Sequence, residues 1–271
     1  MLTNSSFRPI LALALLLLSQ ASWAVTVLVA VASDFTKPMT EIAAAFEKAT
    51  GHTAKLSFGS SGKAFAQIQS GAPFDLYLSA SEKYPLELEK SGFAVSGSHF
   101  VYAIGKLVLW SATPGYVDGQ GEILKTGDFK HIALADPSHA PYGVVAVEVM
   151  NSLGVLDKLR PLFVMGENIS QTFQFVSTGN AELGFVGLAQ VIDVNSGKAS
   201  APAHAPYLRP VGKIGSGSGW IIPDNLHSPF RQMAVLLKTG AENPAAHALA
   251  DFLKSPPALA IIEKYGFGLP K

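Results

Sequence analysis

A junction at Ser57–Ala64 (SFGSSGKA) limits the possible folds more than any other part of the sequence. Residues Thr53–Phe58 have the alternation and β-forming content of a strand, and Phe65, Ile68 and Gln69 follow at helical spacing. Two serines and two glycines therefore stand where a strand passes into a helix. Glycine lets the backbone approach a ligand, and the first helical turn has unpaired N–H groups. Such a junction can hold an anion, although a serine that only caps the helix is the competing interpretation.

The residues around this junction predict a βαβαβ unit. The run Val25–Ala32 is apolar and rich in β-branched residues, which is typical of a strand buried on both faces. A helix with Pro38 in its first turn ends at Gly51, and the strand Phe74–Leu78 precedes a helix at Glu82–Ser91. We therefore expect a parallel sheet with helices on its faces.

The second half of the chain repeats this plan without a repeated sequence. Strands are expected at 107–110, 132–135, 162–165 and 183–186, with helices at 144–153 and 171–177. A Gly/Ser-rich link at 213–219 precedes a strand at 220–222, and the last part of the chain predicts helices at 230–237, 244–253 and 257–265.

These elements predict an α/β protein of two lobes. We expect the first lobe to comprise residues 25–105 plus 218–271 and the second lobe residues 106–217. The chain then crosses between the lobes twice, which makes a hinge. Hinged α/β lobes bind ligands in the cleft between them.

Four strand-to-helix junctions are expected to meet in that cleft. They lie at Ser33-Asp34, Ser60-Ser61, Pro141–Gly143 and Asn168–Ser170, two in each lobe. Since ligands of open parallel sheets bind at the carboxyl ends of the strands, hydroxyls and helix N-termini converge there from both sides. The sequence therefore predicts a site for a small anion.

Enzyme interpretations are weaker. The junction at Gly59–Ala64 lacks the spacing of a phosphate-binding P-loop, and Lys63 stands where a nucleophile elbow has its last glycine. The seven histidines show no metal-binding spacing, and the formal net charge of zero argues against nucleic acid as a partner. We expect no enzyme activity and no cofactor; a periplasmic hydrolase that uses Ser61 is the alternative from another class.

The N-terminus has the pattern of a secretory signal peptide over residues 1–24. Arg8 precedes the apolar run Ile10–Leu18, and Ser22-Trp23-Ala24 offers small residues for cleavage near Ala24/Val25. The sequence has no cysteine, so it has neither disulfides nor a cysteine for lipid attachment. We expect a soluble periplasmic protein.

Six segments together carry a resemblance that covers residues 25–271. They are VAVASDFTKPM, SFGSSGKAFAQIQSGAPFDLYLSA, ADPSHAPYG, GENISQTFQFVSTGNAELGFV, SGSGWIIP and LKSPPALAIIEKYGF. The chain resembles the periplasmic molybdate-binding proteins of bacterial ABC uptake systems. The resemblance implies a two-lobed, monomeric periplasmic binding protein that closes on molybdate or tungstate. It would deliver this ligand to a membrane permease with a cytoplasmic ATPase. Another tetrahedral oxyanion, such as sulfate, is the alternative ligand.

The resemblance also implies the contacts to the oxyanion. They fall on Ser33 and Ser61, by hydroxyl and amide, and on Tyr142 and Ile169, by the backbone N–H. No residue is expected to bind a metal cation, because the molybdenum would be held as its oxyanion.

Two positions depart from the family pattern. Gly187 stands where some members place a tyrosine hydroxyl toward the ligand, so that donor is missing unless Tyr142 replaces it. Asp34, an additional candidate contact, stands where a neutral residue is usual. A carboxylate about 5 Å from a dianion would cost several kcal/mol at an effective dielectric constant near 20. We therefore expect Asp34 to turn outward and cap the following helix or meet Lys37.

Overall fold

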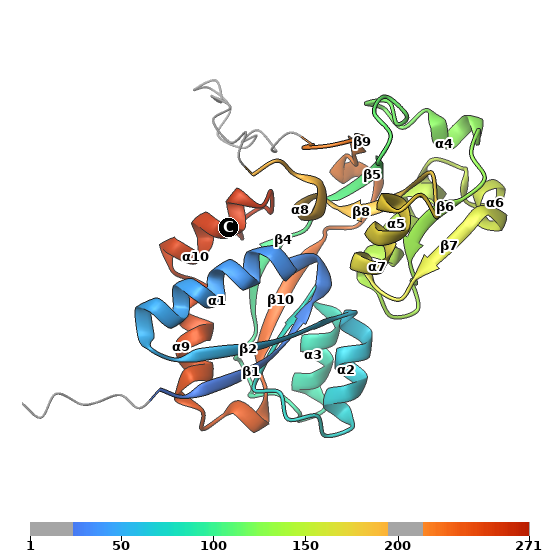
Figure 1. The fold of residues 1–271 in the computed structure, drawn as a ribbon. Helices are drawn as coiled ribbons and strands as arrows, with labels where there is room; N and C mark the ends of the chain where they lie inside the picture. The colour runs from blue at the N-terminus through green and yellow to red at the C-terminus, as the bar shows by residue number, and fades with distance from the viewer. Residues whose placement is uncertain (1–23, 195–213, 271) are drawn as a thin grey trace, which may run out of the picture.

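Two five-stranded sheets, one in each lobe, form the framework of the protein (Figure 1). The structure is a computed structural model that describes residues 24–194 and 214–270. The first sheet has the strand order β2-β1-β3-β10-β4. Its strands are β1 (Thr26–Ala32), β2 (Thr53–Gly59), β3 (Leu76–Ser79), β4 (Phe100–Ile104) and β10 (Arg231–Leu236).

The second sheet has the order β7-β6-β8-β5-β9. Its strands are β5 (Leu107–Ser111), β6 (Ile132–Ala135), β7 (Phe163–Gly166), β8 (Leu183–Gly187) and β9 (Ser218–Ile221). Each sheet has a parallel part, β2-β1-β3 in the first lobe and β7-β6-β8 in the second. Antiparallel strands complete each sheet. Both sheets are therefore mixed, whereas the sequence predicted parallel sheets.

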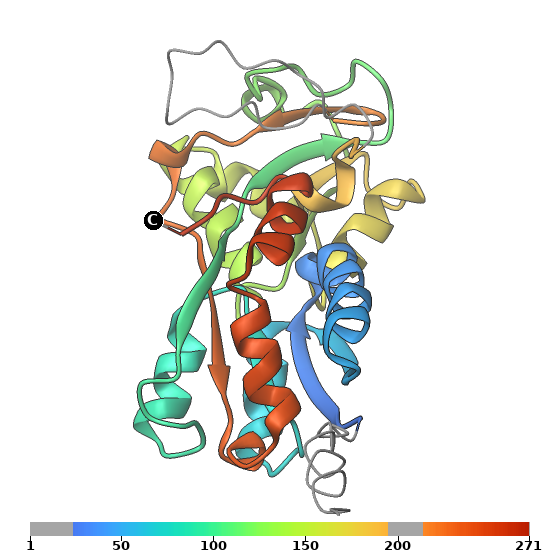
Figure 2. The ribbon, with the colours of Figure 1, turned by 90° about the vertical axis from the view of Figure 1, so that its left-hand side faces the viewer.

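Helices cover both faces of the first sheet. The long helices are α1 (Thr36–Thr50), α2 (Ser61–Gln69), α3 (Lys83–Lys90), α9 (Pro244–Phe252) and α10 (Pro256–Lys264). Helices α1, α9 and α10 lie on one face of the sheet and α2 and α3 on the other (Figures 1 and 2). Val29 and Val31 of β1 belong to the core with α1, α9 and α10, whereas Ala30 belongs to the core with α2 and α3. This confirms β1 as a strand buried on both faces.

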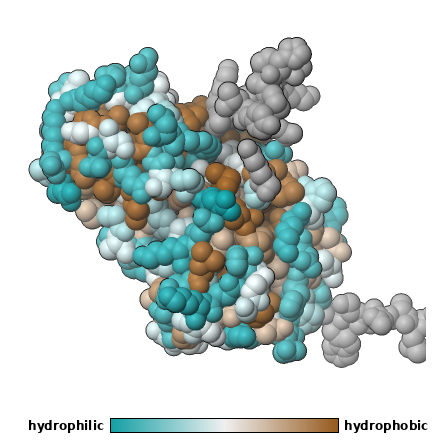
Figure 3. Space-filling model, turned by 180° about the vertical axis from the view of Figure 1, so that it is seen from behind, coloured by the Kyte–Doolittle hydropathy of each residue, from teal (hydrophilic) through white to brown (hydrophobic). Residues whose placement is uncertain are grey.

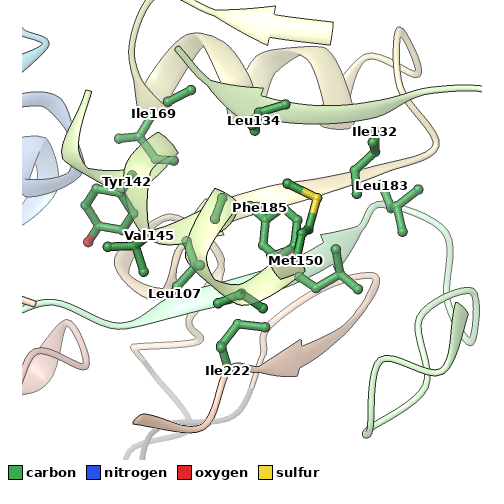
Figure 4. Close-up of a cluster of buried hydrophobic side chains, with 14 of the residues drawn as sticks. Leu107, Ile132, Leu134, Tyr142, Val145, Met150, Ile169, Leu183, Phe185 and Ile222 are labelled. Carbon is green, nitrogen blue, oxygen red and sulfur yellow. The ribbon is translucent and has the colours of Figure 1, made fainter. Parts of the chain in front are cut away.

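The second lobe is built in the same way. Its helices are α4 (Ile123–Thr126), α5 (Pro141–Ser152), α6 (Leu156–Leu159), α7 (Ile169–Ser177) and α8 (Leu188–Val191). One core holds Leu107, Leu134 and Phe185 together with residues of α5 (Figure 4), and a second core on the other face holds Val108 and Val186 with residues of α7 and α8. Short 3-10 turns lie at Ser33–Phe35, Arg160–Leu162, Asp224–Leu226 and Lys238–Gly240.

One expected helix is wrong. Residues 231–236 form the strand β10, which lies between β3 and β4 and is buried from Gln232 onward. A short apolar run that is buried on both faces has no period that separates strand from helix. Hydrogen bonding to β3 and β4 on either side makes this segment a strand.

The chain crosses between the sheets twice, first between β4 and β5 (Figure 2) and again between β9 and β10. The expectation assigned residues from 218 onward to the first lobe, but β9 pairs with β5 of the second sheet, with Trp220 opposite Leu109. The second crossing therefore lies at 222–230. We propose residues 24–104 plus 223–270 as the first lobe and 105–222, in its described part, as the second.

The surface seen from behind mixes hydrophilic and hydrophobic residues (Figure 3). None of the helices in the described ranges has the length and apolar character needed to cross a membrane. The expected signal peptide, apart from Ala24, lies outside the described residues, as do residues 195–213 between α8 and β9.

Candidate ligand-binding site

A small pocket lies where the four predicted junctions meet. The first lobe contributes the ends of β1, β2 and β3, and the second lobe contributes the N-termini of α5 and α7. Its walls are formed by Ala32, Ser33, Asp34, Gly59, Ser60, Ser61, Ala80, Ala140, Pro141, Tyr142 and Ile169. All five candidate residues, Ser33, Asp34, Ser61, Tyr142 and Ile169, thus line one pocket between the lobes.

The two serines of the central junction have different partners. Ser60 is the N-cap of α2, and its hydroxyl accepts a hydrogen bond from the Lys63 N–H at 3.3 Å. Ser61 is the first residue of the helix and is 1% exposed. Its hydroxyl oxygen accepts from the Ala80 N–H at 2.9 Å, so the hydroxyl proton is left to donate. The geometry therefore separates a capping serine from one suited to donate to an anion.

Ser33 lies against the other lobe. Its hydroxyl donates to Oδ1 of Asn168 at 3.3 Å, and its carbonyl accepts from the Ser170 hydroxyl at 3.1 Å. Asn168 is the N-cap of α7 and accepts from the N–H groups of Ser170 and Gln171. Asn168 thus does not accept from the N–H of Ile169, the first residue of the helix. This N–H lies at the positive end of the helix dipole. The buried Ile169 side chain keeps water from this point.

Tyr142 occupies the first turn of α5, after Pro141, and no side chain caps this helix. Its ring packs edge-on against Phe230, with the ring centroids 4.3 Å apart. A Cβ atom at Gly187 would come within 3.4 Å of the Tyr142 hydroxyl oxygen. The Tyr142 ring therefore lies in the space that a larger residue at 187 would enter. Figure 4 shows the same ring beside Ile169 and Val145 at the end of the core.

The expected outward position of Asp34 is wrong. Asp34 is 2% exposed, and its Oδ2 accepts hydrogen bonds from the Tyr142 hydroxyl at 3.0 Å and from Nε2 of Gln232. Lys37 instead donates to the carbonyl of Gln190 at 3.0 Å. Burial raises the pKa of Asp34 to about 6, against the hydrogen bonds from Gln232 and Tyr142, which lower it. Donors from the second lobe and from β10 replace the solvent that an exposed carboxylate would have.

Gln232 and Tyr102 also belong to the site, although the sequence did not predict them. Tyr102 donates to Oε1 of Gln232 at 2.8 Å, which orients the amide so that its Nε2 faces Asp34. Gln232 is fully buried in β10 and was expected in a helix. One feature of the sequence could have indicated Gln232: it is a single amide beside the apolar run Met233–Leu237. A polar residue that is buried with such a run needs a hydrogen-bond partner.

The lobes touch around the pocket. The Gly62 N–H donates to the carbonyl of His139 at 2.8 Å, and Lys63 forms an ion pair with Glu167 at 2.9 Å. Both contacts join α2 of the first lobe to loops of the second. The structure therefore shows the cleft closed over the pocket.

Such a closed, two-lobed α/β fold with a pocket between the lobes defines a solute-binding protein. Residues 27–268 match the family described as "Bacterial extracellular solute-binding protein", and the chain belongs to this family.

Two relatives are particularly similar. The "Molybdate-binding protein ModA" of Azotobacter vinelandii is 49% identical over 262 residues, 97% of each chain. That of Rhodobacter capsulatus is 50% identical over 241 residues, 89% of this chain and 87% of the relative. The solved structure of the Azotobacter vinelandii periplasmic molybdate-binding protein superposes with a TM-score of 0.82 at 41% identity. It covers 90% of this chain and all of the other.

Proposed function

We propose that this protein captures molybdate, or tungstate, in the cleft between its lobes and delivers it to an ABC importer. The observation that carries the proposal is the pocket, in which serines of the first lobe face the N-termini of α5 and α7 in the second lobe. These are donors without a formal charge, and they suit an oxyanion that must be released again. Relatives named for molybdate binding share about half of the sequence over nearly its full length.

The contacts that we propose are those that the family resemblance implies, and the pocket that brings these residues together supports them. Ser33 and Ser61 donate from hydroxyl and amide in the first lobe, and the Ser33 hydroxyl gives up its bond to Asn168 to do so. The N–H groups of Tyr142 and Ile169 donate in the second lobe. A ligand held from both sides stabilises the closed arrangement, because each lobe alone offers only half of the donors.

The chain acts as a binding protein and not as an enzyme, as its family membership indicates. A serine hydrolase would need a base within hydrogen-bond reach of its nucleophile. Among the described residues, no hydrogen bond joins a histidine to the hydroxyl of Ser60 or Ser61; the Ser61 oxygen accepts from Ala80 instead.

The setting of this function is the periplasm. We propose cleavage of a signal peptide near Ala24/Val25 and action as a monomer that docks on the membrane permease of the importer and its ATPase. The solved relative is described as periplasmic, which supports this location.

Titration calorimetry of the chain from Val25 onward with molybdate, tungstate, sulfate and phosphate tests the proposal. We expect tight binding of molybdate and tungstate and much weaker binding of the other two anions. A hundredfold excess of ligand over its Kd should stabilise the folded protein by about 2.7 kcal/mol, which a melting scan detects. Tighter binding of sulfate, or no melting shift with molybdate, would contradict the proposal.

A further inference from the structure

Among the described residues that line the pocket, Asp34 is the one acidic residue. Both side chains that donate to it, the Tyr142 hydroxyl and Nε2 of Gln232, bind Oδ2, and the backbone N–H groups of Asp34 and Phe35 also lower its pKa. Oδ1 is buried and has no hydrogen-bond partner. A buried carboxylate oxygen without a partner is costly, so this atom is a candidate for contact with whatever fills the pocket.

The residues that hold Asp34 do not offset its charge. The two phenols that face it, Tyr142 of α5 and Tyr102 of β4, have pKa values raised well above the ordinary value by burial, so both are neutral. Gln232 of β10 contributes an amide. These groups orient the carboxyl but leave the pocket with a negative charge whenever Asp34 is ionised.

The elements packed around Asp34 supply no cation either. Helices α7 and α8 contain no ionisable residue in their bounds. On α1, α2 and β10, three positive side chains have other partners, in the pairs Lys37 with the Gln190 carbonyl, Lys63 with Glu167, and Arg231 with Glu82. Lys48 lies in the last turn of α1, at the opposite end of the helix from Asp34. An ionised Asp34 would therefore repel a bound dianion with no paired cation beside it to screen the charge.

We propose that Asp34 takes up one proton from solvent when the oxyanion binds, and that Oδ1 donates this proton in a hydrogen bond to a ligand oxygen. The inference rests on the proposed function, since it needs an oxyanion in the pocket. Protonation changes Oδ1 from a repelling acceptor into a donor and leaves Oδ2 to accept from Tyr142 and Gln232. The pKa of about 6 is already above the ordinary value for an aspartate, and a nearby dianion raises it further.

This coupling makes capture depend on pH. Each bound oxyanion would carry one proton into the closed cleft, so the Kd should rise by up to tenfold for each pH unit above about pH 7. Molybdate itself stays a dianion in that range and adds no slope of its own.

Titration calorimetry with molybdate at about pH 7.5, in HEPES and in Tris, counts the protons from the difference in buffer ionisation enthalpy. We expect the wild-type protein to take up close to one proton per molybdate. Asp34→Asn should bind molybdate at least as tightly, because its amide N–H replaces the proton on Oδ1, with no proton uptake and a flat pH profile. Asp136→Asn, which changes a partly exposed carboxylate on the turn after β6, is the matched control and should keep the wild-type uptake.

Two results would overturn the inference and leave molybdate capture intact. One is wild-type binding without proton uptake. The other is Asp34→Asn that still takes up a proton, because the proton would then reside on the ligand. Failure of the wild-type protein to bind molybdate would instead refute the proposed function itself. The wild-type proton count needs no variant, so the test holds even if Asp34→Asn does not fold.

Discussion

The Gly62 N–H donates to the His139 carbonyl oxygen at 2.8 Å across the cleft, and a Cβ atom at Gly62 would lie 2.7 Å from that same oxygen. The two backbones therefore approach each other in the closed arrangement more closely than any side chain at position 62 allows. Glycine is required here by this approach and not by its backbone angles, since Gly62 lies in the first turn of α2.

Gly62→Ala should consequently weaken molybdate binding. The added methyl group opposes closure at a cost of about 1–3 kcal/mol, roughly fivefold to 150-fold in Kd. Alanine favours the helix, so the ligand-free protein should lose little stability in the open arrangement. Calorimetric titration measures the effect, with Gly119→Ala, where a Cβ atom meets open space, as the control. Equal affinity of the two variants would show that binding does not need this contact.

Alanine substitutions of the two serines at the start of α2 should have different effects on binding and on stability. Ser61→Ala removes the proposed donor to a charged ligand, and we expect molybdate binding to weaken by about 1.5–3 kcal/mol. Ser60→Ala removes the helix cap and should lower the free energy of unfolding by about 1 kcal/mol with a smaller effect on Kd. Titration and urea unfolding of both variants make the comparison, and a greater loss of affinity in Ser60→Ala would contradict the assignment.

Tyr142→Phe tests the hydrogen bond that joins the lobes through Asp34. The ring can keep its contact with Phe230, but Oδ2 of Asp34 loses one of its two donors. We expect the free energy of unfolding to fall by about 1–3 kcal/mol near pH 7, as for a buried acceptor that loses its partner. Tyr116→Phe, whose hydroxyl bond to the Asp128 carbonyl is exposed, is the control and should change stability by less than about 0.5 kcal/mol.

Asp34 should also make the ligand-free protein less stable as pH rises from about 4 to about 6. Burial raises its pKa from 3.8 to about 6, so in this window the folded protein binds more protons than the unfolded chain. Stability falls with pH wherever the folded state holds the extra proton, by up to about 3 kcal/mol here. Above about pH 6 the stability of the folded protein no longer falls from this cause, because Asp34 is then ionised in both the folded and the unfolded protein.

Other carboxyl groups, such as Glu41 and Asp136, have lowered pKa values and act in the opposite direction. The measurement is therefore the difference in urea unfolding between the wild-type protein and Asp34→Asn. We expect the free energy of unfolding of Asp34→Asn to increase relative to that of the wild-type protein between about pH 4 and pH 6. A difference that does not vary with pH would mean that Asp34 is not desolvated in the folded protein.

Much of the site could be predicted from the sequence because its elements are local. The strand-to-helix junction at Ser57–Ala64 depends on neighbouring residues: the serines, the glycines and the helical spacing after them. Parallel strands then bring such junctions to one edge of each sheet, so Ser33, Ser61, Tyr142 and Ile169 were predicted to lie together, and they line one pocket.

Three features were decided by the tertiary structure. Residues 231–236 became a strand, and Ser218–Ile221 joined the second sheet, because hydrogen bonds to strands far away in the sequence were available there. Asp34 is buried because Tyr142 and Gln232, 108 and 198 positions away, supply its donors. Local sequence determines the periodicity and the caps, but the state of a buried charge depends on partners that only the folded chain brings together.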